Sequence, residues 1–154
     1  MKKILLIIAA IFLMASCAWA AGTCTQTPYY YQPNGAVTVT LVCTADATGA
    51  IDTQVIESGT MNILKGYYYL YQVVTFPGAT APDAADVTVK MNGIDLLGAK
   101  GVNLIHATAT QDTLPYSTFM SAYRYPLITD NLTVTVANQA TNAAKYTIKL
   151  IFAK

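Results

Sequence analysis

The stretch VTVTLVCT, residues 37–44, alternates apolar and polar side chains without interruption. A period of two, rich in β-branched residues, is typical of a β-strand with one face on a core and the other in water. The same alternation recurs at residues 86–92, 132–136 and 145–152. These four runs predict an all-β chain.

Between the runs lie turn signals rich in Gly, Pro, Asn and Asp, at residues 33–35, 48–49, 58–59, 77–78, 92–93, 100–101, 129–131 and 138–142. Short strands with turns about every dozen residues predict an antiparallel β-sandwich, jelly-roll or immunoglobulin-like. We expect one such domain over residues 36–154, preceded by an extended segment at 21–35. Residues 115–125 are expected to be a loop with room for a single helical turn.

Two turns have a specific expected geometry. Asn92-Gly93 is a favoured pair for a two-residue hairpin. At Pro77-Gly78, proline fixes one φ and glycine permits a positive φ at the next residue, which predicts a tight reversal.

The N-terminus has the form of a bacterial export signal over residues 1–20. Lys2-Lys3 precedes an apolar run too short to span a bilayer, and small residues follow it. Two processing schemes fit: cleavage after Ala20, or a lipoprotein box with acylation of Cys17. The predicted location is therefore secreted, periplasmic or cell-surface, with membrane attachment only if Cys17 is lipidated.

Cys24 and Cys43 remain after either scheme, and an isolated pair in an exported chain predicts a disulfide. A redox motif would need Cys-x-x-Cys spacing. A zinc site would need further ligands, and His106 is the only histidine.

Charged residues make up 11% of the chain, well below the roughly 25% typical of soluble domains. Loss of residues 1–20 leaves seven basic against eight acidic residues. This balance argues against nucleic-acid binding, which needs clustered cations. A surface with so few charges is poorly protected against self-association.

Segment 73–114 carries the motifs VVTFPGATAP (73–82), DVTV (86–89), GIDLLG (93–98) and ATATQ (107–111). They resemble those of a family of small tailed-phage structural proteins, and the similarity runs from about Gly35 to the C-terminus. The resemblance implies a β-sandwich building block of a surface assembly. The chain departs from that family in its export signal and in the order Thr110-Gln111-Asp112.

No catalytic constellation stands out. His106 has no recognisable nucleophile motif beside it and is expected to be structural. The acidic residues are scattered over turns, and nothing in the sequence pairs two carboxylates across a cleft as a glycosidase requires. Residues 46–52 lack the dense acids of a calcium loop. We therefore expect neither an enzyme nor a cofactor.

Tyrosines are the main candidate contact residues. They cluster at residues 29–31, at 67–71 and at 116, 123 and 125. The stretch 67–76 is apolar or aromatic on both faces, so it is either a strand covered on both sides or one exposed to a partner. Neighbouring side chains on a strand point in opposite directions, so we expect contacts through Tyr67, Tyr69 and Tyr71, or through Tyr68.

The predicted function is thus a non-catalytic structural subunit that contacts identical copies or another surface protein. The main alternative is a secreted carbohydrate-binding module with coplanar, spaced tyrosines. A fimbrial subunit completed by a donated strand is disfavoured by Pro28 and Pro33 in the N-terminal segment. A secreted hydrolase is the weakest alternative.

Overall fold

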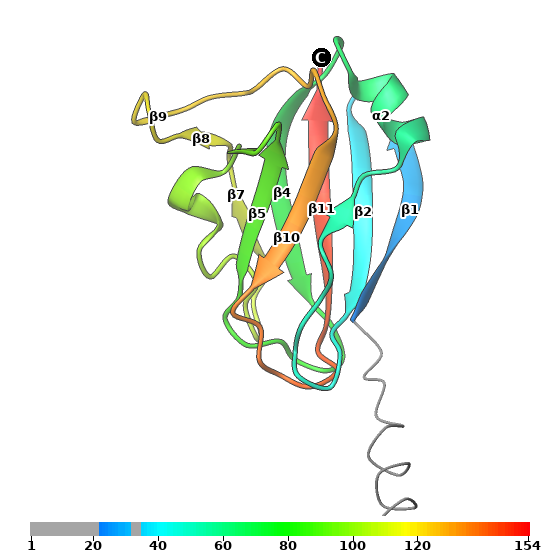
Figure 1. Ribbon diagram of the computed structural model, residues 1–154, viewed down its shortest axis with the longest axis vertical. Coiled ribbons are helices and arrows are strands. Elements are labelled where there is room, and N and C mark those ends of the chain that lie inside the picture. The colour runs from blue at the N-terminus through cyan, green and yellow to red at the C-terminus, as the bar shows by residue number, and fades with distance from the viewer. Residues whose placement is uncertain (1–21, 32–34) are drawn as a thin grey trace, which may run out of the picture.

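The computed structural model describes residues 22–31 and 35–154, and this part of the chain consists mainly of β-strands with one short α-helix (Figure 1). The predicted signal segment lies outside the described residues. The strands are β1 (Thr23–Tyr31), β2 (Val37–Thr44), β3 (Gln54–Val55), β4 (Tyr69–Pro77), β5 (Asp86–Met91), β6 (Ile94–Asp95), β7 (Gln111–Thr113), β8 (Tyr116–Ser117), β9 (Ala122–Tyr123), β10 (Leu132–Ala137) and β11 (Lys145–Ala153). The helices are α2 (Ser58–Leu64) and the 3-10 turn η1 (Gly98–Gly101).

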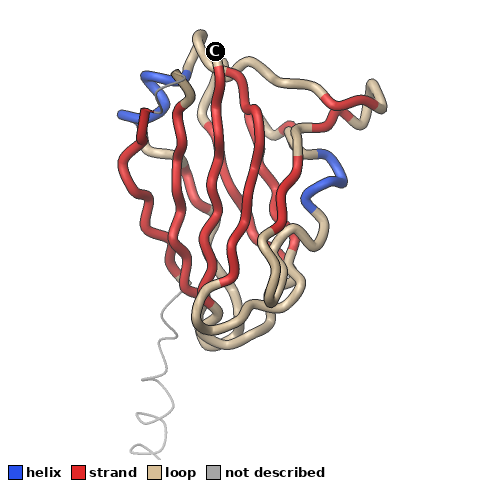
Figure 2. Tube along the Cα trace, turned by 180° about the vertical axis from the view of Figure 1, so that it is seen from behind, coloured by secondary structure: helices blue, strands red, loops and turns tan. Residues whose placement is uncertain are grey.

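Most of the described strands belong to two antiparallel sheets. The large sheet has the order β1-β2-β11-β4-β7, and the small sheet has the order β3-β10-β5-β6. Figure 1 shows β5 and β10 in front of β4 and β11, and Figure 2 shows the large sheet from behind. The predicted all-β, antiparallel class is confirmed, and the four alternating runs are β2, β5, β10 and β11. The jelly-roll or immunoglobulin-like subclass stays a prediction.

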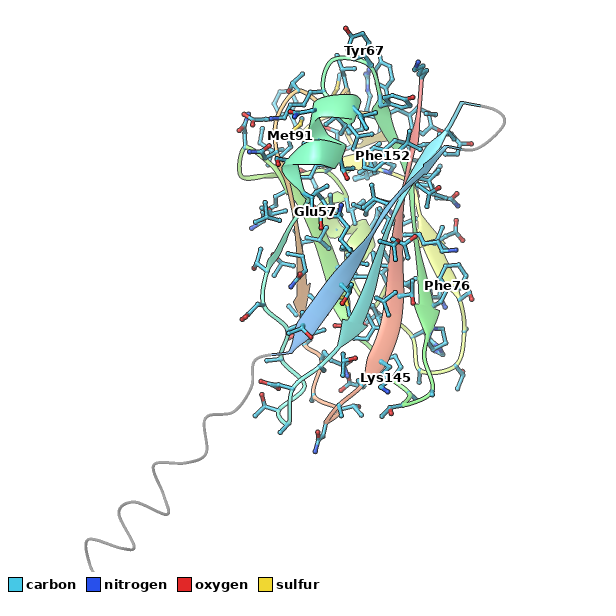
Figure 3. All side chains as sticks on the ribbon, turned by 90° about the vertical axis from the view of Figure 1, so that its right-hand side faces the viewer. Glu57, Tyr67, Phe76, Met91, Lys145 and Phe152 are labelled. Atoms are coloured by element: carbon cyan, nitrogen blue, oxygen red, sulfur yellow. A yellow bond between two sulfur atoms is a disulfide. The ribbon has the colours of Figure 1, made fainter. Side chains whose placement is uncertain are left out.

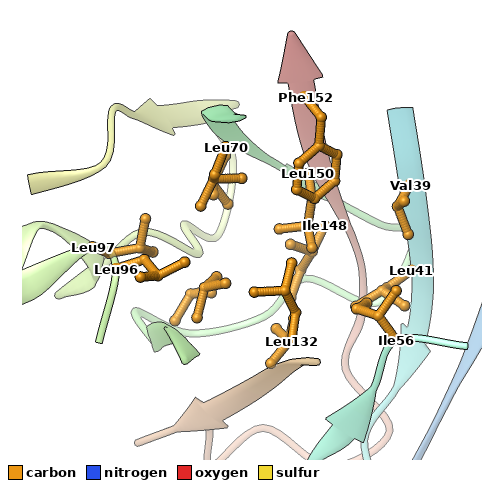
Figure 4. Packing of buried hydrophobic residues seen from close by; sticks show 14 of the residues in the cluster. Val39, Leu41, Ile56, Leu70, Leu96, Leu97, Leu132, Ile148, Leu150 and Phe152 are labelled. Atoms are coloured by element: carbon orange, nitrogen blue, oxygen red, sulfur yellow. The ribbon is translucent and has the colours of Figure 1, made fainter. Parts of the chain in front are cut away.

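The core lies between the two sheets. On β11 every second side chain is buried, from Tyr146 through Ile148 and Leu150 to Phe152. Residues of the small sheet, such as Leu132, join the same buried cluster, and Figure 4 shows them packed together. Complete burial of one such side chain contributes about 1.5–3 kcal/mol to stability.

Within the predicted N-terminal extended segment, Thr23–Tyr31 forms strand β1 of the large sheet. β1 pairs with β2 from Thr23↔Thr44 to Tyr31↔Val37, with an irregularity between Thr27 and Tyr30. Cys24 and Cys43 are direct partners in this register, 4.0 Å apart at Cα, and they form the predicted disulfide. Cys43 is fully buried and Cys24 packs against the core, so the bridge fixes the edge strand to the body of the fold.

Of the two turns with a predicted geometry, Asn92-Gly93 has that geometry and Pro77-Gly78 does not. Asn92 and Gly93 have φ values of 51° and 77°, and they join Met91 to its hairpin partner Ile94 as predicted. Gly78 does not take the expected positive φ. Its amide donates to the Lys145 carbonyl at 2.7 Å, and a Cβ atom on Gly78 would lie 2.6 Å from that oxygen. Close approach of two chain segments therefore explains this glycine.

Residues 115–125 do not contain the helical turn for which the sequence left room. They form a hairpin in which Tyr116 pairs with Tyr123 and Ser117 with Ala122. Figure 1 shows β8 and β9 projecting from the body of the fold, and we call residues 116–123 the arm. Phe119 and Tyr123 are four residues apart, as on one face of a helix, but Tyr123 instead packs across the hairpin, edge-on to Tyr116 with ring centroids 5.3 Å apart.

Helix α2 was not predicted, because Ser58-Gly59 was interpreted only as a turn. The helix buries Thr60, Met61 and Leu64 against the core. Gln26 connects it to β1: the Gln26 amide donates to Thr60 Oγ1 at 3.0 Å and accepts from the Glu57 amide at 3.1 Å. No helix within residues 22–31 and 35–154 combines the length and apolar character needed to cross a membrane.

Candidate functional site

The tyrosines around the start of β4 divide between surface and core. Tyr67, Tyr69 and Tyr71 are 70%, 41% and 44% exposed, whereas Tyr68 is only 3% exposed. On β4 Leu70 continues this alternation, and the pattern then shifts by one residue, so the next buried side chains are Val73 and Thr75. Tyr68 is thus a core residue and the prediction of it as a contact residue is wrong. The sequence allowed residues 67–76 to be either a strand covered on both faces or a strand exposed to a partner. The exposed tyrosines exclude a strand covered on both faces.

Tyr125 extends the exposed set from a distant part of the sequence. The segment around Pro126 runs beside β4, because the Leu70 amide donates to the Pro126 carbonyl at 3.1 Å and Tyr69 bridges to Leu127. The Tyr125 ring consequently stacks on Tyr71, with centroids 5.2 Å apart and planes 18° apart. We call Tyr67, Tyr69, Tyr71 and Tyr125 the tyrosine face.

This arrangement suits contact with a large surface. Tyrosine offers an apolar ring and a hydroxyl that hydrogen-bonds at the rim, and aromatic residues are enriched in protein interfaces. The carbohydrate-module alternative expects coplanar rings spaced like sugar units. Tyr71 and Tyr125 instead stack directly on each other, so no sugar ring fits between them.

The other two tyrosine clusters have different settings. Side chains of residues 29–31 lie outside the described part of the structure. In the arm, the Lys100 ammonium lies over the rings of both Tyr116 and Tyr123, 5.0 and 5.8 Å from their centroids. This cluster therefore fixes the arm to η1.

His106 is exposed, and its ring accepts hydrogen bonds from nearby backbone amides. Its Nδ1 accepts hydrogen bonds from the amides of Thr108 and Ala109, at 3.2 and 3.1 Å. The segment after His106 is a bend, and Ile105, just before it, forms a single β-bridge to Ala85. The imidazole thus stabilises a turn.

The carboxylates also serve turns. Asp46 accepts from the amide and hydroxyl of Thr48, both at 2.7 Å, and from the Ala50 amide at 2.9 Å. These bonds, that from the Thr48 hydroxyl foremost, hold the pKa of Asp46 below its usual value. Other acids that accept from a backbone amide are Asp83, Asp86, Asp95 and Asp130. Within the described residues no group of three or more His, Cys, Asp or Glu side chains could hold a metal ion.

Sequence reasoning missed Tyr125 as a partner of Tyr71 and the exposed arm tip at Phe119 and Met120, which are 96% and 52% exposed. The aromatic cluster at 116–125 was visible in the sequence, but its position beside β4 depends on pairing between distant segments.

In comparisons with protein-family models, curated proteins and solved structures, the chain matched none of them.

Proposed function

We propose that this chain is a non-catalytic, exported structural subunit of a surface or phage-like assembly, and that it contacts its partners through the tyrosine face. The observation that carries the proposal is the exposure of Tyr67, Tyr69 and Tyr71, to which the Tyr125 ring is joined by stacking. The first partner is another copy of the chain; the second is a different structural protein of the same assembly.

The physical argument concerns what these rings gain on contact. Burial of apolar surface yields about 25 cal/mol per Å², and aromatic rings are large while restricting few torsions. The low charge of the chain also limits electrostatic repulsion between copies. Nucleic acid remains an unsuitable partner because few cations are available to replace its counterions.

The test is the oligomeric state of the purified protein, measured by size-exclusion chromatography with light scattering over a range of concentrations. The triple variant Tyr67→Ser, Tyr69→Ser, Tyr71→Ser should dissociate the assembly while its melting temperature changes little. Val55→Ser is the matched control, since Val55 is 64% exposed on β3. A wild-type protein that stays monomeric at high concentration, and binds no other structural protein, would contradict the proposal.

A carbohydrate-binding module remains the alternative function. Retention on an insoluble polysaccharide that is lost on Tyr71→Ala would favour it over self-association. Unchanged retention in that variant would exclude the tyrosine face as the sugar site.

A further inference from the structure

A second concave surface lies between the arm and the β5–β6 hairpin. It encloses a cavity of about 330 Å³, at the lower end of the usual range for small-molecule sites. Tyr116, Phe119 and Pro126 contribute apolar walls, and Asp95 and Arg124 contribute charges of opposite sign. We call it the arm hollow. None of its lining residues belongs to the tyrosine face.

The arm hollow is held open by specific contacts. The Tyr116 amide donates to the Leu96 carbonyl at 3.0 Å, and this bond fixes the base of the arm to the body of the fold. Gly98 has a φ of 53°, and a Cβ atom there would lie 2.9 Å from Thr118 Cγ2. The arm can approach η1 this closely because Gly98 has no side chain. The cavity is therefore a built feature of the fold.

The charges of the hollow are not paired with each other. Asp95 is half-buried, and its Oδ1 accepts from the Leu97 amide at 3.0 Å. Arg124 is exposed, and within the described residues no ion pair joins it to Asp95. At the same place Phe119 and Ile94 expose 96% and 68% of their surface, so apolar walls face the same space as two opposite charges that form no ion pair with each other.

We propose that the arm hollow binds a ring of a neutral sugar. A purely apolar ligand would remove water from Asp95 and Arg124 without replacing their hydrogen bonds, which costs free energy. A ligand of single charge would be attracted by one of the two residues and repelled by the other. A sugar ring can donate hydroxyls to the carboxylate, accept from the guanidinium and place its C–H face against Tyr116 or Phe119.

A neighbouring cavity extends the site. It has a volume of about 440 Å³, and it shares Ile94, Asp95 and Thr118 with the arm hollow. Asp86 and Thr88 contribute polar groups to its lining. Two adjoining cavities, one walled by rings and the other more polar, fit consecutive units of an oligosaccharide.

The test is an NMR titration of the ¹⁵N-labelled protein with neutral monosaccharides and disaccharides. With a monosaccharide, amide shifts should be confined to residues 91–98 and 116–126. A disaccharide should add shifts at residues 86–88 and 98–102 and should bind more tightly than its monosaccharide. Asp95→Asn and Phe119→Ala should each weaken binding by about tenfold or more. Phe119→Ala removes a ring that is almost fully exposed, so folding is preserved, and Tyr67→Ala is the control that should bind as the wild type does.

Three results would overturn this inference. The first is the absence of shifts with every neutral sugar tested. The second is binding that neither Asp95→Asn nor Phe119→Ala weakens. The third is binding of free amino acids or charged ligands in place of sugars. Because the tyrosine face shares no residue with this site, loss of self-association and loss of sugar binding can be told apart.

Discussion

A phenylalanine at the centre of the large sheet and a phenylalanine at the tip of the arm differ completely in solvent exposure. Phe152 on β11 is fully buried between the two sheets, whereas Phe119 at the tip of the arm is 96% exposed. The first contributes to folding through burial, and the second has no comparable contact. The residues that stabilise the core and those proposed to bind a ligand thus lie in different parts of the molecule, so we expect each property to be changeable without the other.

The largest expected effect tests this separation directly. Phe152→Ala should lower the free energy of unfolding by about 3–5 kcal/mol, because it leaves a cavity in the core. Phe119→Ala should change it by no more than about 0.5 kcal/mol, as for other surface positions. Urea denaturation followed by circular dichroism measures both. Equal losses in the two variants would show that the arm is part of the cooperative core.

The disulfide provides the next largest effect. The double variant Cys24→Ser, Cys43→Ser should lose roughly 3 kcal/mol, the chain-entropy value for a loop of this length. Reduction of the wild type should produce a similar loss of stability. The contacts proposed for the arm hollow and for the tyrosine face should persist below the new melting temperature. Identical melting curves with and without reductant would mean that the bridge contributes nothing measurable.

Two buried hydroxyl groups, one hydrogen-bonded and one not, test how polar groups contribute to the stability of the core. Thr75 Oγ1 donates to the Leu104 carbonyl at 2.5 Å, whereas Tyr146 Oη has no hydrogen-bond partner within the described residues. Thr75→Val should therefore cost about 1–3 kcal/mol, because it leaves a buried carbonyl unpaired. Tyr146→Phe should be neutral or stabilising by up to about 1 kcal/mol. A clear loss of stability in Tyr146→Phe would reveal a partner for that hydroxyl.

Asp46, in the loop after β2, and Asp95, in β6, should respond to pH with opposite sign. Hydrogen bonds lower the pKa of Asp46, so its charge stabilises the fold above the ordinary carboxyl pKa of 3.8, and this contribution is lost as the pH falls. Burial raises the pKa of Asp95, so its favourable contribution is present in acid and is lost as the pH rises through the folded-state pKa.

At neutral pH, Asp46→Asn should therefore be less stable than the wild type and Asp95→Asn more stable, and both differences should shrink towards pH 3. Thermal melting at intervals between pH 3 and pH 7 measures them. The same sign for both variants would contradict the assignment of hydrogen bonding to one carboxylate and burial to the other.

The sequence could predict those features that depend only on residues close together in the chain. Alternation located β2, β5, β10 and β11, because a strand between a core and water carries that pattern in its own residues. Cys24 and Cys43 could be paired because the third cysteine, Cys17, is removed or acylated in either predicted processing scheme. Helix α2 was missed because seven residues are too few for a clear helical period.

The candidate sites depend on contacts that no local pattern contains. Alternation indicates that Tyr68 and Tyr69 face opposite sides, but only the tertiary arrangement shows that Tyr68 is the inner one. The stacking of Tyr125 on Tyr71, and the cavity between the arm and Asp95, depend on segments far apart in the sequence.

The strand register of the large sheet also determines how the protein would be oriented relative to a membrane to which its N-terminus was attached. Thr23 is level with Thr44 and Lys145, and Figure 3 places Lys145 at one end of the molecule and Tyr67 at the other. Met91, which lines the arm hollow, lies near the Tyr67 end. A lipid attached to Cys17 would hold the molecule to a bilayer by its Thr23 end. Both candidate contact regions would then be displayed on the side turned away from that bilayer, available to molecules arriving from outside.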